Sequence, residues 1–165
     1  MPEKILVAYA SRAGSTAEIA AVIGETLAAH GAVVDVLPLK SVTSLAGYRA
    51  VVIGSAIRFG GWLPEAVKFV EHNREALNQR PLAIFAAHIL NTDGEETSRQ
   101  NRQLYLEPVR KLVTPRAEAL FAGVGDPKKV SFVERQLYKA VKAPQGDYRD
   151  WQAIRAWAES LENIL

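Results

Sequence analysis

Short, almost continuous apolar runs alternate with segments of helical periodicity along most of this 165-residue chain. In the first run, residues 4–9, every position after Lys4 is apolar, as expected of a parallel strand that is buried on both faces. The next segment, residues 16–29, places Ile23 and Leu27 on one face and stops before Gly31. Such alternation predicts βα units, which right-handed crossovers join into an open parallel sheet with helices on both faces.

The other predicted elements repeat this alternation. Further strands are predicted at residues 33–37, 50–54, 82–87 and 117–124, and further helices at 64–77, 100–113, 131–142 and from Asp147 or Asp150 to Leu161. The sequence therefore predicts the α/β class, as a flavodoxin-like three-layer sandwich whose five-stranded parallel sheet has the order 2-1-3-4-5. There is no internal repeat and no convincing boundary, so we expect a single domain over residues 1–165.

Composition excludes several functional classes. The chain has no cysteine, so disulfides, thiolate metal sites and a cysteine nucleophile are excluded. No spacing of His, Asp and Glu indicates a metal site, and a net charge of +2 is too small to indicate nucleic-acid binding. No apolar run approaches the roughly 18 residues that span a bilayer, and residues 1–4 lack the layout of a signal peptide. We therefore expect a cytoplasmic protein, with peripheral contact to the inner face of a membrane left open.

The turn between the first strand and the first helix is rich in small and hydroxyl residues. It reads Ser11-Arg12-Ala13-Gly14-Ser15-Thr16. A phosphate group needs converging donors, which short hydroxyl side chains and the backbone N–H groups of a helix N-terminus supply. Ser15 and Glu18 also fit a capping box, so a plain serine-rich helix cap is the alternative. The turn matches neither the dinucleotide fingerprint Gly-x-Gly-x-x-Gly nor the triphosphate-binding pattern Gly-x-x-x-x-Gly-Lys-Ser/Thr.

The loop predicted after the third strand, residues 54–62, mixes small, aromatic and cationic residues. In the predicted sheet order it lies beside the first loop, at the edge where open α/β sheets bind ligands. Its candidate cofactor-binding residues are Ser55, Ala56, Ile57, Arg58, Phe59 and Gly60. Phe59 and Trp62 could cover the face of a flavin ring, although Trp62 could equally pack on the following helix. Arg58 could meet an acidic substrate or a reduced flavin, or could be only a solvated charge.

A third loop, residues 87–94, follows the fourth predicted strand at the same edge of the sheet. Its backbone and Asn91 could hydrogen-bond the pyrimidine edge of a flavin, so Ala87, His88 and Asn91 complete the candidate residues. His88 could titrate near neutrality, although a lone histidine is more often structural. Together the three loops predict a site for flavin mononucleotide (FMN). No set of side chains here looks able to perform redox chemistry, so the flavin would have to supply it.

Three stretches resemble the flavodoxin superfamily, and more narrowly the menaquinone-dependent protoporphyrinogen IX dehydrogenases of bacterial type. They are residues 11–16, residues 51–60, of which Ile57-Arg58-Phe59-Gly60 is the most specific part, and residues 147–151. The resemblance implies an FMN enzyme that oxidises a tetrapyrrole and passes electrons to a quinone. It implies phosphate contacts from residues 11–16 and ring contacts from residues 55–60 and from the loop that begins at Ala87. Arg58 would then steer a substrate propionate.

Two departures from this family concern charge. Residues 93–96 are acidic where the bacterial enzymes are basic, and the basic character of residues 126–142 is moderate. The helix predicted at residues 131–142 could rest on an anionic membrane, cover the substrate, or pack on the sheet with a solvated basic face.

Another function is open to the same fold. A flavodoxin can act as an electron carrier that serves redox partner proteins and turns over no substrate. Such carriers are usually strongly acidic to match basic partners, whereas the isoelectric point of this sequence is about 8.9.

A phospho-receiver domain would need clustered acids after the first strand and an aspartate after the third. Ala10-Ser11 and Gly54-Ser55 occupy those places, so that function is excluded.

Overall fold

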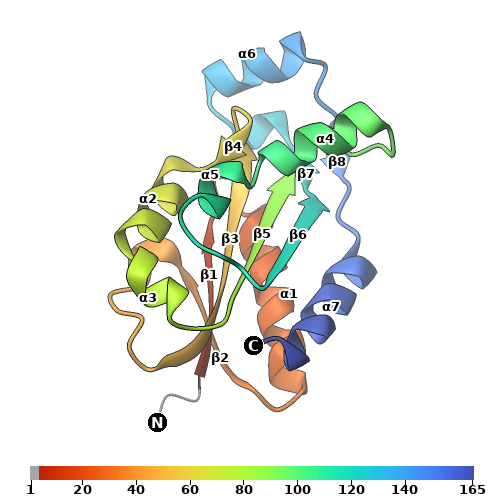
Figure 1. Ribbon diagram of the computed structural model, residues 1–165. Helices are drawn as coiled ribbons and strands as arrows, with labels where there is room; N and C mark the ends of the chain where they lie inside the picture. Colours follow the sequence, from red (N-terminus) through yellow and green to blue (C-terminus); the bar gives the residue numbers. More distant parts are fainter. Residues whose placement is uncertain (1–3) are drawn as a thin grey trace.

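A sheet of five parallel strands forms the centre of the structure, a computed structural model that describes residues 4–165 (Figure 1). The strands are β1 (Lys4–Ala10), β2 (Val33–Pro38), β3 (Tyr48–Arg58), β5 (Leu82–His88) and β6 (Ala117–Ala122). Their spatial order, β2-β1-β3-β5-β6, confirms the predicted order 2-1-3-4-5. The first three residues of the segment considered as a signal peptide lie outside the described residues.

Helices cover both faces of the sheet (Figure 1). One face is covered by α1 (Ser15–Ala29) and α7 (Trp151–Ser160), and the other by α2 (Pro64–His72), α3 (Arg74–Asn78) and α5 (Glu107–Arg110). Successive strand residues point to opposite faces, so Val52 packs in the core under α1, while Val51 and Ile53 pack in the core under α2. Two buried faces explain why the strands are apolar at nearly every position.

The remaining elements lie mostly at the carboxyl ends of the strands (Figure 1). They are α4 (Glu96–Leu104), α6 (Phe132–Ala140), the short strands β4 (Gly61–Trp62), β7 (Val124–Gly125) and β8 (Gly146–Asp147), and the 3₁₀ turns η1 (Leu39–Ser41), η2 (Pro127–Lys129) and η3 (Leu161–Asn163). β4 pairs antiparallel with the end of β3, and β7 pairs antiparallel with β8. The helix α6 lies beyond the carboxyl ends of the strands, at the end of the molecule that carries the predicted loops (Figure 1).

Several predicted boundaries were wrong. The third strand continues past Gly54 to Arg58, because β1 and β5 pair with it as far as Ser55 and Ala56 and β4 pairs with its last two residues. The helix predicted at 64–77 is broken at Asn73, whose side chain donates to the backbone oxygen of Phe69. The helix predicted at 100–113 is divided into α4 and α5, since Pro108 has no N–H to continue the helical hydrogen bonds. The fifth strand ends at Ala122 and α6 ends at Ala140, both earlier than predicted.

The starts of the helices also test the sequence patterns. The capping box predicted for Ser15 and Glu18 is absent, because the N-cap of α1 is Gly14 in a left-handed conformation, with φ 95° and no side-chain cap. The two other predicted caps are present. The Ser131 hydroxyl accepts from the Glu134 N–H at 3.2 Å, and the carboxylate of Asp150, rather than Asp147, accepts from the Ala153 N–H at 3.0 Å.

Candidate functional site

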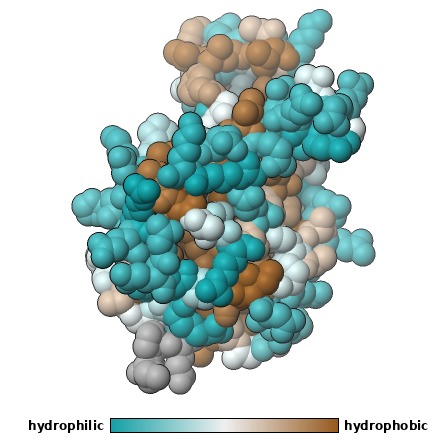
Figure 2. Space-filling model, in the orientation of Figure 1, coloured by the Kyte–Doolittle hydropathy of each residue, from teal (hydrophilic) through white to brown (hydrophobic). Residues whose placement is uncertain are grey.

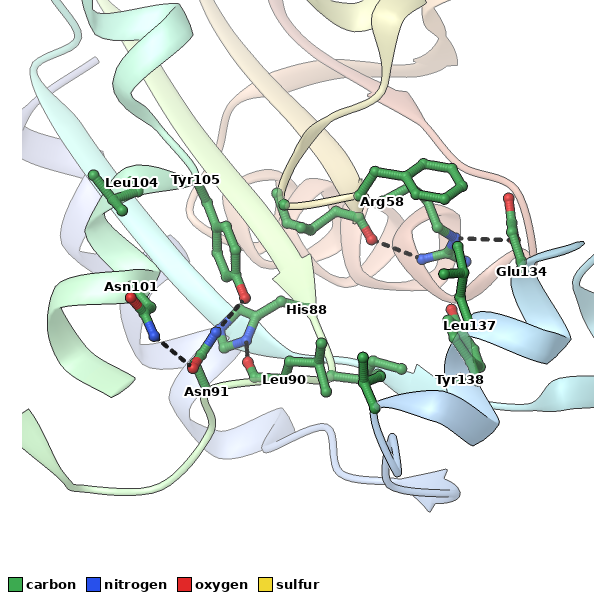
Figure 3. Close-up of a pocket in the computed structure, with 15 residues that line it drawn as sticks. Arg58, His88, Leu90, Asn91, Asn101, Leu104, Tyr105, Glu134, Leu137 and Tyr138 are labelled. Carbon is green, nitrogen blue, oxygen red and sulfur yellow. Dashed lines mark hydrogen bonds and ion pairs between the residues drawn. The ribbon is translucent and has the colours of Figure 1, made fainter. Parts of the chain in front are cut away.

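The second and third predicted loops border a cavity of about 410 Å³ at the carboxyl ends of β3 and β5 (Figure 3). Its walls come from residues 57–60 and 88–91, from the α4 region through Asn101, Leu104 and Tyr105, and from α6 and the residue after it through Glu134, Leu137, Tyr138 and Val141. Most of these side chains are apolar or aromatic, with a few polar groups among them. This is the usual composition of a site for a small organic ligand.

The turn before α1 contains an unsatisfied hydroxyl group. Thr16 is fully buried, and its Oγ1 has no hydrogen-bond partner among residues 4–165. Buried hydroxyl groups are nearly always hydrogen-bonded, so an unsatisfied one indicates a missing partner. The group lies in the first turn of a 15-residue helix, where the backbone dipoles attract anions. This turn therefore fits the phosphate group that the sequence predicts.

Two contacts fix the conformation of this turn. The Gly14 N–H donates to the Ser11 hydroxyl at 3.0 Å. The Arg12 guanidinium donates two hydrogen bonds to the Glu65 carboxylate of α2, the second of them at 3.0 Å. The same bonds lower the pKa of the Glu65 carboxyl below its ordinary value. Glu65 thus compensates the charge of Arg12, and their pairing ties the turn to α2.

The end of β3 turns back into β4 through Phe59 and Gly60. Both have positive φ, 52° and 79°, as a two-residue type I′ hairpin turn requires. Phenylalanine is strained in this conformation, and its side chain is 75% exposed, so packing does not hold it there. An exposed aromatic in a strained turn at the mouth of a cavity indicates a role in binding.

We expect Phe59→Asn to raise the free energy of unfolding of the ligand-free protein by about 1 kcal/mol, because Asn-Gly is the favoured type I′ pair. The same variant should bind FMN more weakly, because the ring is lost. Denaturant unfolding and flavin titration measure the two effects. A destabilised variant would show that the Phe59 ring packs in the folded protein.

The Arg58 side chain lies between β3 and α6 (Figure 3). Its Nε is 3.6 Å from the Glu134 carboxylate, and the two side chains are only 12% and 16% exposed. Its Nη1 donates to the backbone oxygen of Ile57 at 2.9 Å. Within the described chain its buried Nε–H has no hydrogen-bond partner. Arg58 is therefore no freely solvated charge, and it retains a donor for a ligand.

Two predicted residues of this loop have structural contacts. The buried Ser55 hydroxyl donates to the Ala56 carbonyl at 2.8 Å and accepts from the Leu63 N–H at 3.0 Å. Trp62 is 4% exposed and packs in the hydrophobic core. Of the two predicted roles for Trp62, packing under the following helix is the observed one. Ser55 and Trp62 thus support the hairpin that carries Arg58 and Phe59.

His88 ends β5 and is buried beside Tyr105, with 5.4 Å between the ring centres. Its Nδ1 lies 2.8 Å from the backbone oxygen of Leu90. A carbonyl only accepts, so Nδ1 carries the proton and Nε2 is the unprotonated nitrogen. Burial, and to a smaller extent the charge of Arg102, lower the pKa of His88. The ring is therefore neutral at pH 7 and offers an acceptor nitrogen.

His88 should make the stability depend on pH. Its folded pKa lies below the ordinary value of 6.5, so below about pH 6.5 the unfolded chain binds a proton that the folded chain does not. The free energy of unfolding should therefore fall as the pH drops from 6.5 towards 5. We expect His88→Asn to lose less stability over this interval, measured by denaturant unfolding at each pH. Identical slopes for both proteins would contradict this.

Asn91 connects the third loop to α4. It has a positive φ of 58°. Its amide group donates to the Tyr105 hydroxyl at 2.8 Å and accepts from Asn101 at 3.2 Å (Figure 3). Its backbone oxygen accepts from Arg102 at 2.6 Å. Asn91 therefore lies in the cavity wall with its amide already bonded to Asn101 and Tyr105, and its contact with a flavin stays a prediction.

Sequence reasoning missed the contribution of α4, and it gave covering the substrate as only one of three alternatives for the helix at residues 131–142. Glu134, Leu137, Tyr138 and Val141 all line the cavity, and their spacing places them on one face of a helix. This spacing in the sequence indicates a helix face made of these four residues, but it does not indicate which loops that face lies against. Among residues 4–165, no group of three or more His, Asp or Glu side chains is placed to hold a metal ion.

Comparison with known proteins identifies the family. The family model described as "Flavodoxin domain" matches residues 6–152, most of the chain. The chain belongs to the flavodoxin domain family. Among solved structures, this flavodoxin-domain protein is similar to an archaeal flavodoxin, with a TM-score of 0.61 and 17% identity over 97% of this chain and 96% of the other. A Streptococcus pneumoniae flavodoxin has a TM-score of 0.59 and 16% identity over 98% and 99%. These likenesses confirm the flavodoxin-like fold.

Two similar proteins with curated names carry the name protoporphyrinogen IX dehydrogenase [quinone]. The Escherichia coli K12 protein is 23% identical over 177 residues, covering 98% of this chain and 96% of its own length. The Leishmania major protein is 26% identical over 174 residues, covering 96% of this chain and 74% of its own length.

Proposed function

We propose that this protein is an FMN-dependent oxidoreductase that oxidises a tetrapyrrole and passes the electrons to a quinone. The proposal is supported most directly by the largely apolar cavity between the β3–β4 hairpin, His88 and α6. Arg58 contributes a positive charge to its wall. The names of the Escherichia coli and Leishmania major relatives support the substrate and the acceptor. In this proposal residues 1–165 act as one domain.

The residues fit FMN in two places. Ser11, Ser15 and the unsatisfied Thr16 hydroxyl would hold the phosphate together with the first N–H groups of α1. Residues 55–60 would flank one side of the ring system, and Ala87, His88 and Asn91 the other. The bound flavin would supply the acceptor for two electrons.

The chain's own side chains would position the substrate and exclude water. Ile57 and Leu137 contribute apolar walls to the cavity, where charge interactions are stronger than in water. The Arg58 guanidinium would bind a substrate carboxylate, in competition with the Glu134 carboxylate that faces its Nε at 3.6 Å without a hydrogen bond. Oxidation of a tetrapyrrole releases protons, and the unprotonated Nε2 of His88 would accept one of them.

The test begins with the absorption spectrum of the purified protein, which should show bound flavin. Protoporphyrinogen and menadione are then supplied, and the fluorescence of the porphyrin product is followed. Turnover above the spontaneous rate supports the proposal. Bound FMN without turnover would overturn the enzyme activity, and absence of any flavin affinity would overturn flavin binding as well.

An electron carrier is the second candidate. The solved structures with the same fold are named flavodoxins, and exposed apolar side chains such as Phe59 and Leu104 surround the cavity mouth, where a protein partner could dock. A carrier would bind FMN, leave protoporphyrinogen unchanged and reduce or oxidise a partner protein. With a net charge of +2, the chain lacks the strongly acidic character that usually matches a carrier to basic partners, so the enzyme is the leading proposal.

The proposed location is the cytoplasm, with peripheral contact to a membrane from which a quinone could be drawn. No helix within residues 4–165 is long and apolar enough to cross a membrane.

A further inference from the structure

A second cavity, of about 350 Å³, lies against the neighbouring face of α6 and is strongly basic. Lys128, Arg135, Lys139 and Lys142 line it together with Tyr138 and Gln145, and no carboxylate does. None of these four cations makes an ion pair within the part of the chain that the structure describes. Four cations around one hollow repel one another, so an anion bound there would be stabilised by all of them.

Two hydrogen bonds between side chains and the backbone shape this cavity. The Arg135 Nε donates to the backbone oxygen of Pro127 at 2.9 Å, which joins α6 to η2. The Asp126 carboxylate accepts from the Lys128 N–H at 2.9 Å and shapes the same turn. The backbone positions of η2 and α6 therefore place the four cations around one hollow, and the Arg135 side chain is also held by its hydrogen bond.

The outer surface of α6 is apolar beside these cations. Phe132 is 70% exposed and Val133 is 65% exposed, and no residue of α6 is buried. Figure 2 shows hydrophobic residues gathered at this end of the molecule, where Figure 1 places α6. A helix that exposes large apolar side chains next to lysine and arginine has the pattern of one that lies in a membrane interface.

We infer that α6 and the basic cavity bind an anionic phospholipid, with the lipid phosphate among Lys128, Arg135, Lys139 and Lys142 and the acyl region against Phe132 and Val133. A soluble phosphate ester would satisfy the four cations, but it would leave both apolar side chains in water. An anionic lipid satisfies both features, because cationic residues near such a surface are attracted by its negative potential. This site is separate from the proposed FMN site and gives the peripheral membrane contact a chemical partner.

The test uses co-sedimentation of the purified protein with vesicles. We expect binding to phosphatidylcholine vesicles that contain phosphatidylglycerol, and little binding to phosphatidylcholine alone. The variant Arg135→Gln/Lys139→Gln should bind at least about tenfold more weakly, since each cation near the surface contributes roughly fivefold. Phe132→Ser should also weaken binding with every cation retained.

The matched control is Lys68→Gln/Lys111→Gln, which removes two exposed lysines elsewhere on the surface. It should bind the mixed vesicles as the wild type does, and an equal loss in the control would overturn a defined site. Absence of binding to the mixed vesicles would overturn the inference, as would saturable binding of inorganic phosphate without vesicle binding. Circular dichroism verifies that each variant is folded. No arm depends on FMN or turnover, so failure here is distinguishable from failure of the proposed function.

Discussion

Replacing Thr16 by valine is expected to weaken FMN binding without destabilising the ligand-free protein. Valine has nearly the same shape, and the buried hydroxyl that it removes has no partner among the described residues. Removing an unsatisfied buried polar group is neutral or stabilising, whereas losing a hydrogen bond to a charged phosphate costs about 1.5–3 kcal/mol. The dissociation constant should therefore rise by roughly ten- to a hundredfold. Flavin titration and thermal unfolding of the ligand-free protein measure the two effects.

Thr26 provides a matched control on the same helix. Its hydroxyl donates to the backbone oxygen of Val22 at 2.8 Å, away from the turn at residues 11–16. Thr26→Val removes the same atom type from α1 and should leave FMN affinity unchanged. If Thr16→Val bound FMN as the wild type does and unfolded more easily, the hydroxyl would be structural and the predicted phosphate site would be wrong.

The sheet could be predicted because burial on both faces leaves a local signal. Val51, Val52 and Ile53 are consecutive and fully buried: Val51 and Ile53 pack in the core on one face of the sheet, and Val52 packs in the core on the other. Such a continuous apolar run shows no helical or amphipathic periodicity that would compete with a strand. The end of the same strand could not be predicted. Ser55 and Ala56 still pair with the neighbouring parallel strands, but Ile57 and Arg58 continue the strand because β4 folds back against them. That pairing depends on a turn whose first residue, Phe59, is unfavourable there.

The position of the three loops at one edge of the sheet could be predicted, but the position of α6 over the cavity could not. Parallel strands bring their carboxyl ends to one edge, so the strand order alone places the three loops together. The pairing of Arg58 with Glu134 joins distant parts of the chain through a helix with no buried residue. No local pattern marks such a contact, which explains why the sequence alone does not decide between a ligand contact and a solvated charge for Arg58.

Replacing Arg58 by alanine is expected to reduce kcat/KM for a carboxylate-bearing tetrapyrrole by roughly ten- to a hundredfold, with FMN still bound. The estimate follows from the loss of one hydrogen bond to a charged group, about 1.5–3 kcal/mol. Glu134→Gln should act in the opposite direction on substrate affinity. Its carboxylate faces the Arg58 Nε at 3.6 Å, and a substrate carboxylate must compete with it for the guanidinium. Steady-state kinetics with flavin occupancy measured on each sample test both variants.

The two variants separate a substrate contact from a structural ion pair. If the pair only holds α6 in place, Arg58→Ala and Glu134→Gln should lower turnover alike, because either change breaks it. If Arg58 binds the substrate, Glu134→Gln should lower KM by a few-fold while Arg58→Ala raises it, since only the competing anion is removed. Arg110→Ala is the matched control, because Arg110 pairs with Glu107 and Glu118 outside the cavity. Loss of FMN from Arg58→Ala would instead assign Arg58 to the cofactor.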